Sequence, residues 1–172
     1  MKINDKINYE SCLVKGKRID NEEWVQGNLI WSNDAENGYE AIIIPTTNSG
    51  MYARPDDTGD LGFEKWYRVD PSTLCRCTGS RDKNGELIWE NDIVKFTVYN
   101  YEKALTPIVS NVQWCDEIWA FSIVVNTKGN RGTLGHILQS NKEAEVIGNK
   151  FDNPELTKVK TDNVEDKIMN DR

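Results

Sequence analysis

The sequence predicts a mainly β protein, either all-β or β-rich α+β. Short segments rich in β-branched and aromatic residues alternate with breaks rich in Gly, Asn and Pro, and no window before Asn153 gives a convincing amphipathic helix. Short strands at this spacing are typical of a small barrel or sandwich. In the C-terminal half, the expected strands cover residues 87–89, 92–99, 106–114, 118–125, 133–139 and 144–147.

The N-terminal half predicts further strands around a long loop. Residues 23–31 and 39–45 carry β-branched and aromatic side chains, whereas residues 46–61 place Gly and Pro among polar residues and predict a loop. Residues 1–20 hold few apolar positions, so we expect a surface strand or an ordered arm there. Two more short strands are expected at residues 63–69 and 74–77.

The composition favours a folded, acidic protein. The 21 Lys and Arg against 28 Asp and Glu give a formal net charge of −7. This balance opposes non-specific binding to nucleic acid, which depends on Lys and Arg neutralising phosphates. Because the sequence has no run of about 18 apolar residues and no apolar signal segment, we expect a cytoplasmic protein with four reduced cysteines and no membrane contact.

Residues 78–94, TGSRDKNGELIWENDIV, predict a β-hairpin that leads into a turn and a second strand. Asn84-Gly85 supplies the two positive-φ residues that a type I′ turn needs. The Asp82 carboxylate can accept hydrogen bonds from backbone amides two residues on. The residues expected to make turns in this segment are Thr78, Gly79, Asp82, Asn84, Gly85 and Asp92.

This segment resembles the core motif of the YopX family of phage and prophage proteins. A second match, EVIGNKFDNPEL at residues 145–156, resembles the closing segment of that family and includes Gly148 and Asn149. The order and separation of the two matches agree with the family. One departure is Asn91, where the family usually has Gly; Asn tolerates left-handed backbone better than other side chains, so we expect the turn to survive.

The resemblance implies a mainly β fold with an SH3-like barrel, in an uncharacterised family without an established activity. We expect an N-terminal β-rich segment at 1–77, intertwined with the rest or separate from it. A YopX-like barrel core is expected at 78–151, and an acidic tail or short helix at 152–172. Phage or prophage origin implies the cytoplasm of a bacterial host cell.

The sequence offers little for catalysis or metal binding. Cys75 and Cys77 would point to one face of a strand, but zinc needs two further ligands, so burial in the core is favoured. His136 is the only histidine and is expected on a strand, partly packed among Leu and Ile. The common nucleotide, metalloprotease and hydrolase motifs are absent, so we expect no catalytic residue, no metal and no cofactor.

The aromatic residues are more informative about binding than the cysteines or the histidine. Core packing accounts for most of the six tryptophans, because a thin barrel needs large side chains. An exposed aromatic patch would serve as a contact for a partner or for a second copy. The candidates, which lie near the long loop, are Tyr52, Trp66 and Tyr67.

We therefore expect a non-enzymatic protein-binding or assembly module that contacts a phage or host protein, or itself, as a homo-oligomer. One alternative is a nucleic-acid-associated accessory protein, for which local basic residues must gather on one face despite the net charge. These residues are Lys15, Lys17, Arg18, Lys128 and Arg131. A second alternative is a small metal-dependent or hydrolytic enzyme.

Overall fold

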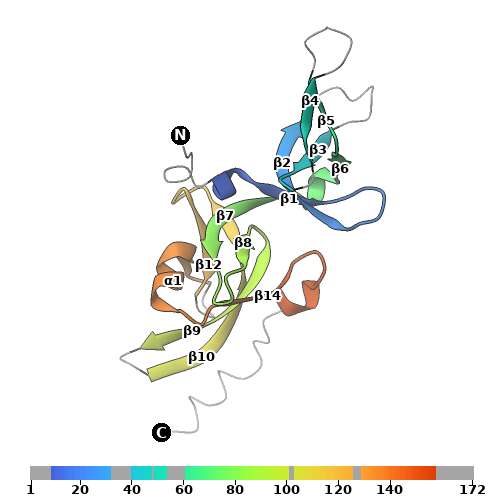
Figure 1. Cartoon of the computed structure of the whole chain (residues 1–172). Helices are drawn as coiled ribbons and strands as arrows, with labels where there is room; N and C mark the ends of the chain where they lie inside the picture. Colours follow the sequence, from blue (N-terminus) through green and yellow to red (C-terminus); the bar gives the residue numbers. More distant parts are fainter. Residues whose placement is uncertain are drawn as a thin grey trace, which may run out of the picture. The chain divides into compact units, whose positions relative to one another are not determined.

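The computed structural model describes residues 9–31, 40–47, 49–53, 61–100, 103–125 and 129–157 (Figure 1). The chain divides into two compact units, unit 1 (Met1–Gly79) and unit 2 (Ser80–Arg172). Strands dominate both units, so the mainly β prediction is confirmed. None of the sheets formed by these residues closes into a barrel. Within the same residues, no helix is long and apolar enough to cross a membrane.

Unit 1 is built on an antiparallel sheet with the strand order β6-β3-β2-β1-β7, and β4 pairs separately with β5. A 3-10 helix, Tyr9–Cys12, precedes the sheet, and a second, Pro71–Thr73, leads into β7. The strands are β1 (Val14–Lys17), β2 (Trp24–Trp31), β3 (Ala41–Pro45), β4 (Met51–Ala53), β5 (Leu61–Phe63), β6 (Tyr67–Arg68) and β7 (Cys75–Arg81).

Two predictions for unit 1 need correction. Of the surface strand or ordered arm expected at residues 1–20, a strand is present as β1, but it lies inside the sheet between β2 and β7; residues 1–8 lie outside the described part of the chain. Gly16 on this strand packs against Val69 and Leu74, contacts that local sequence does not reveal. The expected loop at residues 46–61 contains β4, although residues 54–60 lie outside the described part of the chain.

The core of unit 1 lies under the centre of this sheet. Ala41, Ile43 and Val69 are almost fully buried and are surrounded by partly buried side chains of neighbouring strands. Gly27 allows β2 and β3 to approach closely, because a Cβ at this position would overlap the backbone carbonyl of Ile44.

Unit 2 contains two three-stranded antiparallel sheets, β10-β9-β14 and β11-β12-β13, and a short helix. Strand β8 pairs with β7, whose last residues belong to this unit. The elements are β8 (Leu87–Trp89), β9 (Asp92–Asn100), β10 (Lys103–Asn111), β11 (Gln113–Cys115), β12 (Ala120–Val124), β13 (Arg131–Thr133), α1 (Leu134–Ser140), β14 (Glu145–Asn149) and a 3-10 helix (Pro154–Thr157). The remainder of the expected tail, residues 158–172, lies outside the described residues.

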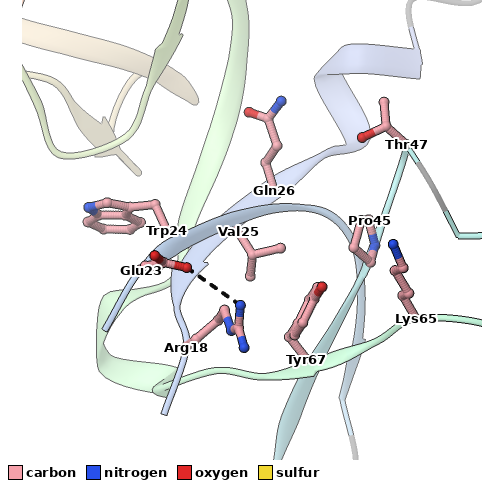
Figure 2. A pocket seen from close by; sticks show the side chains of 9 residues that line it. All are labelled: Arg18, Glu23, Trp24, Val25, Gln26, Pro45, Thr47, Lys65 and Tyr67. Carbon is pink, nitrogen blue, oxygen red and sulfur yellow. Dashed lines mark ion pairs between the residues drawn. The ribbon is translucent and has the colours of Figure 1, made fainter. Parts of the chain in front are cut away.

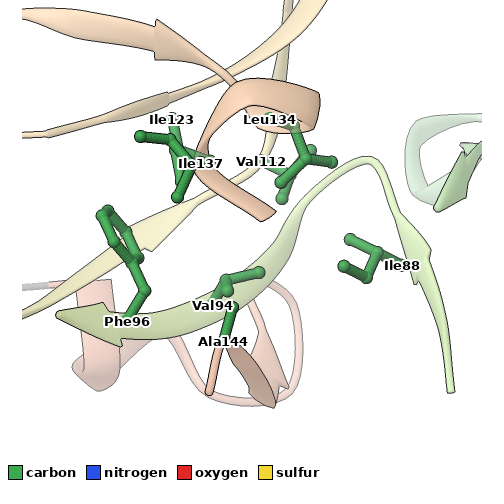
Figure 3. Close-up of a cluster of buried hydrophobic side chains, with 8 residues drawn as sticks. All are labelled: Ile88, Val94, Phe96, Val112, Ile123, Leu134, Ile137 and Ala144. Atoms are coloured by element: carbon green, nitrogen blue, oxygen red, sulfur yellow. The ribbon is translucent and has the colours of Figure 1, made fainter. Parts of the chain in front are cut away.

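Helix α1 covers the core of unit 2, where the sequence predicts a strand. Leu134 and Ile137 are three residues apart on one helical face and point into a cluster of buried aliphatic and aromatic side chains (Figure 3). His136 lies on the exposed face, so the predicted strand histidine is wrong. The cluster consists of Ile88, Val94, Phe96, Val112, Ile123, Leu134, Ile137 and Ala144.

The hairpin between β7 and β8 is present, but its turn is not type I′. Gly85 has φ 84°, whereas Asn84 is not among the described residues with positive φ. The backbone N–H of Gly85 donates to the Asp82 carbonyl at 3.0 Å, and the N–H of Asp82 donates to the Glu86 carbonyl at 2.9 Å. This pattern is a three-residue loop, a type I turn followed by a left-handed glycine. Because the loop also includes Lys83, it needs only one residue with positive φ.

Candidate binding pocket

The Asp82 carboxylate links the hairpin to β14, and thereby joins the two segments that resemble the YopX family. Its Oδ1 accepts from the backbone N–H of Asn84 (2.8 Å) and of Glu86 (3.0 Å). Its Oδ2 accepts from the backbone N–H of Val146 at 3.1 Å. Burial raises the pKa of Asp82, but these hydrogen bonds together outweigh it and hold the pKa below its usual value.

Side chains around Asp82 strengthen the same junction. The Lys83 ammonium lies 2.7 Å from a carboxylate oxygen of Glu145, and the Asn84 amide donates to the other oxygen at 3.4 Å. The hydrogen bond with Glu145 raises the pKa of Lys83, and the pKa of Glu145 is lowered in return. The two side chains of the ion pair are 33% and 37% exposed, so solvent screens the pair and its contribution to stability is small.

Strands β9 and β14 bring further predicted turn residues together. Asp92 lies opposite Asn149 in the antiparallel register, and its carboxylate accepts from the backbone N–H of Trp89 at 2.8 Å. Asn91 adopts φ 70° just before β9, so the left-handed turn survives with Asn in place of Gly. Asn149 caps the following turn, because its side-chain oxygen accepts from the backbone N–H of Phe151 and of Asp152.

Glycines occupy the tightest points of this region. Gly79 has φ 71° next to Thr78 near the end of β7. Gly148 lies at a register shift of β14, and a Cβ there would overlap the side chain of Asn153. These residues make turns and allow close packing.

The residues considered for metal or nucleophilic chemistry do not form a site. Cys75 and Cys77 are buried on β7 with Arg76 exposed between them. The Cys75 thiol lies 3.3 Å from the Thr73 carbonyl, and Cys77 Sγ accepts from the backbone N–H of Gly79. Within the described ranges, no three His, Cys, Asp or Glu side chains gather as metal ligands would.

Unit 1 carries a pocket of about 300 Å³ between the β1–β2 turn and the ends of β3 and β6 (Figure 2). Strand β2 provides the floor through Val25, and the end of β3 provides an apolar wall through Pro45. Tyr67 of β6 stands between Arg18 and Lys65 in this view. The lining residues are Arg18, Glu23, Trp24, Val25, Gln26, Pro45, Thr47, Lys65 and Tyr67.

Strand pairing assembles this pocket from distant parts of the chain. Pro45 reaches β2 because β3 pairs with β2 in the register Gly27↔Pro45. Tyr67 reaches the pocket because β6 pairs with β3 in the register Ile43↔Tyr67. The hydroxyl of Ser49 donates to the Lys65 carbonyl at 2.7 Å, which positions the segment that precedes Tyr67.

Arg18 is held by its own neighbours. Its guanidinium binds the Asp20 carboxylate through Nε at 2.9 Å, lies 3.6 Å from Glu23, and stacks 4.1 Å from the centroid of the Tyr67 ring. The hydrogen bond with Asp20 raises the pKa of Arg18, and the pKa of Asp20 is lowered. The positive charge of Arg18 is therefore largely balanced, and it supports the Tyr67 ring.

Other polar groups of the pocket are available to a ligand. Within the described part of the chain, the Lys65 ammonium, the Gln26 amide and the Tyr67 hydroxyl have no hydrogen-bond partner. Together with Val25 and Pro45, they combine an apolar surface with a few hydrogen-bonding groups, as binding pockets commonly do.

The three predicted contact residues are not gathered at one point. Tyr67 lines the pocket, whereas Trp66 (43% exposed) and Tyr52 (49% exposed) do not. Tyr52 lies opposite Gly62 on the β4–β5 hairpin, with its ring over the glycine. Sequence reasoning missed Arg18 and Lys65 as pocket residues, because only the strand pairing places them beside Tyr67.

Comparison with known proteins agrees with this fold. The structure is similar to the crystal structure of protein EF1440 from Enterococcus faecalis, with a TM-score of 0.52 and 19% sequence identity; the match covers 84% of this chain and 96% of that chain. At this identity the likeness concerns the fold alone. No curated protein matches the sequence. The family model described as YopX protein matches residues 16–158, which includes both units and both joined segments, and the chain therefore belongs to the YopX family.

Proposed function

We propose that this chain is a non-enzymatic protein-binding or assembly module and that the pocket of unit 1 receives a side chain of its protein partner. The observation that carries the proposal is the pocket itself, in which an apolar floor and wall lie beside the available Lys65 ammonium, Gln26 amide and Tyr67 hydroxyl. A cavity of about 300 Å³ suits one large side chain or a short peptide segment.

The exposed apolar side chains of unit 1 support a protein partner. Large hydrophobic side chains are usually buried, and partly exposed aromatic residues are the commonest anchors of protein interfaces. Among the described residues of unit 1, the exposed large hydrophobics are Ile19, Ile30, Trp31, Met51, Tyr52 and Trp66.

Three finer parts of the proposal rest on the family and on general physics. Phage or prophage origin follows from the resemblance to YopX proteins. An SH3-like arrangement of the strands of unit 2 is proposed for the same reason. Self-association as a homo-oligomer is proposed because open sheets leave strand edges that proteins usually cover.

Comparative affinity capture tests the proposal. The immobilised full chain is exposed to a lysate of phage-infected or lysogenic bacteria, in parallel with Lys65→Glu and with the matched control Lys142→Glu. Both lysines are exposed, and neither has a charged partner among the described residues. We expect Lys65→Glu to capture at least about tenfold less of the proteins that the wild-type chain and the control retain. Tyr67→Phe, which removes only a hydroxyl, should reduce the captured amount less.

Retention of the same proteins by Lys65→Glu and by Lys142→Glu would contradict a role of the pocket. Circular dichroism and thermal unfolding of each variant separate loss of binding from loss of folding. A hydrolytic activity in the purified chain that depends on His136 or the buried cysteines would overturn the non-enzymatic part.

Nucleic-acid association remains a second candidate, favoured by one observation. The ammonium groups of Lys15 and Lys17 lie 5.1 and 5.6 Å from the centroid of the Trp24 ring, a combination that suits a stacked base beside phosphate. Arg18 is engaged by two carboxylates, Arg131 donates to Ser122 and Gln113, and Lys128 lies outside the described residues. Fluorescence anisotropy with labelled single-stranded DNA and RNA at low salt tests this candidate, and no binding there excludes it.

A further inference from the structure

Trp119 is the most exposed large hydrophobic side chain in the described part of the chain. It ends the turn at residues 116–119 between β11 and β12, and it is 79% exposed, next to Ile118 at 47%. Trp119 also has φ 50°, a left-handed conformation that is rare for a bulky residue. Strain of this kind persists where the surrounding structure enforces it, and it often marks a functional position.

The turn is held rigidly by the strands on either side. Cys115 pairs with Ala120 at the base of the turn. The Trp114 indole N–H donates to the Asp116 carboxylate at 2.8 Å, and the Trp114 ring packs edge-on against Phe121 with ring centroids 5.2 Å apart. The Trp119 side chain is therefore presented on a fixed support, which lowers the entropy cost of inserting it into a partner.

We propose that the Trp119 turn of one copy inserts into the unit 1 pocket of a second copy. This inference rests on the proposed function of the pocket and names its occupant. The pocket volume of about 300 Å³ accommodates one large aromatic side chain, and its apolar surface at Val25 and Pro45 suits an indole ring. The Lys65 ammonium lies at the pocket to pack on the ring.

Charge complementarity favours a second copy over an unrelated apolar partner. The turn carries Asp116 and Glu117 immediately before its exposed Ile and Trp, and the Glu117 carboxylate has no partner among the described residues. The Lys65 ammonium at the pocket is likewise available. Because each copy has a net charge of −7, association needs such a local attraction between the acidic turn and the Lys65 ammonium of the pocket.

This contact is heterologous, because the turn and the pocket are different surfaces. Each copy carries one of each, so repeated contacts form a ring if the rotation closes and an open chain if it does not. A chain that lacks the turn and a chain that lacks the pocket then form one contact between them and no more.

The test uses sedimentation velocity of the full chain over a range of concentrations. We expect the wild-type chain to assemble beyond a dimer, and Trp119→Gly and Lys65→Glu each to raise the dissociation constant about 30-fold or more. Trp119→Gly is chosen because glycine accepts φ 50°, so the turn itself is preserved. Lys142→Glu, which reverses an exposed charge that the proposed contact does not use, is the control and leaves assembly unchanged.

An equimolar mixture of Trp119→Gly with Lys65→Glu gives the decisive result. We expect a heterodimer that does not grow, since only one intact turn and one intact pocket can meet. In a mixture of Lys65→Glu with Glu117→Lys, each turn meets a pocket of opposite charge in the other variant, so we expect this mixture to assemble beyond a dimer as the wild-type chain does. A monomeric wild-type chain at the highest concentration, unchanged assembly of Trp119→Gly, no heterodimer in the first mixture, or no assembly in the second would each overturn the inference.

These outcomes are distinguishable from failure of the proposed function. If the wild-type chain is monomeric but captured proteins still depend on Lys65, the pocket binds another protein and only the second-copy assignment falls. If capture and assembly are both indifferent to Lys65→Glu, the pocket itself is not a binding site.

Discussion

Removal of the Asp82 carboxylate tests how the two joined segments stabilise unit 2. Asp82→Ala leaves three backbone N–H groups, of Asn84, Glu86 and Val146, without their acceptor. The first two lie in an exposed turn where water replaces the carboxylate, so each loss costs about 0.5–1 kcal/mol. The half-buried N–H of Val146 loses a charged acceptor, which costs about 1.5 kcal/mol.

Together these losses predict that the free energy of unfolding falls by about 2.5–3.5 kcal/mol, which corresponds to a fall in Tm of roughly 5–14 °C. Urea unfolding followed by far-UV circular dichroism measures the change, and hydrogen exchange of the Val146 amide locates it. Asp70→Ala is the matched control. The exposed Asp70 carboxylate accepts one backbone N–H, from Ser72, so its loss costs about 0.5–1 kcal/mol.

The pH dependence gives an independent check of the same carboxylate. The pKa of Asp82 is lower in the folded chain than in the unfolded chain, so its contribution is present above the unfolded value and is lost as pH falls through the folded value. The stability difference between wild type and Asp82→Ala should therefore narrow below about pH 4. Equal costs of Asp82→Ala and Asp70→Ala, with unchanged exchange at Val146, would refute the reasoning.

Three further predictions concern backbone conformation and burial. Asn91→Ala places an alanine, which lacks the polar side chain of Asn, at φ 70°, and it should lower the free energy of unfolding by about 1 kcal/mol. Asn91→Gly should lower the free energy of unfolding less, because glycine accepts this conformation. Equal losses for the two variants would contradict this. Gly27→Ala places a Cβ against the β3 backbone and should lower the free energy of unfolding by more than about 2 kcal/mol. The Cβ of Gly135→Ala meets open space on a helix, so this variant should leave Tm unchanged or raise it in thermal unfolding. In a thiol titration without denaturant, Cys75 and Cys77 should stay unreactive until the chain unfolds, and reaction of all four thiols in the native state would show that the two are accessible.

Elements with strong local signals were predictable from the sequence. The strand at residues 87–89 coincides with β8, and the hairpin before it follows from Asp82 and the Asn-Gly pair. The predicted turn type was wrong because the loop is one residue longer, and this longer loop needs only one residue with positive φ, Gly85. Helix α1 was missed because LGHILQS is only seven residues long, too short for helical periodicity to stand out from a strand-like apolar run.

The pocket could not be predicted from local sequence patterns, for a different reason. Arg18 and Glu23 are close in sequence and their opposite charges suggest a pair, but neither indicates a cavity. Pro45 and Tyr67 reach them only through the pairing of β2 with β3 and of β3 with β6. Tyr67 was a candidate because of its residue type, whereas Lys65 had no signal at all before the strands were paired. The isolated exposure of Trp119 likewise depends on the turn that presents it.

Almost all residues of the two family motifs lie in unit 2, whereas the residues that line the pocket lie in unit 1. Asp82, Asp92 and Asn149 accept backbone hydrogen bonds in unit 2, and those contacts explain their residue types without any ligand. The pocket lies in unit 1, outside both of these motifs, although the family model also covers unit 1 from residue 16. A protein that shares the hairpin and the closing segment therefore shares the junction at Asp82, but it need not share the pocket at Lys65. It follows that these motif residues explain the fold of unit 2, and that the partner proposed for the pocket is to be sought through variants of unit 1.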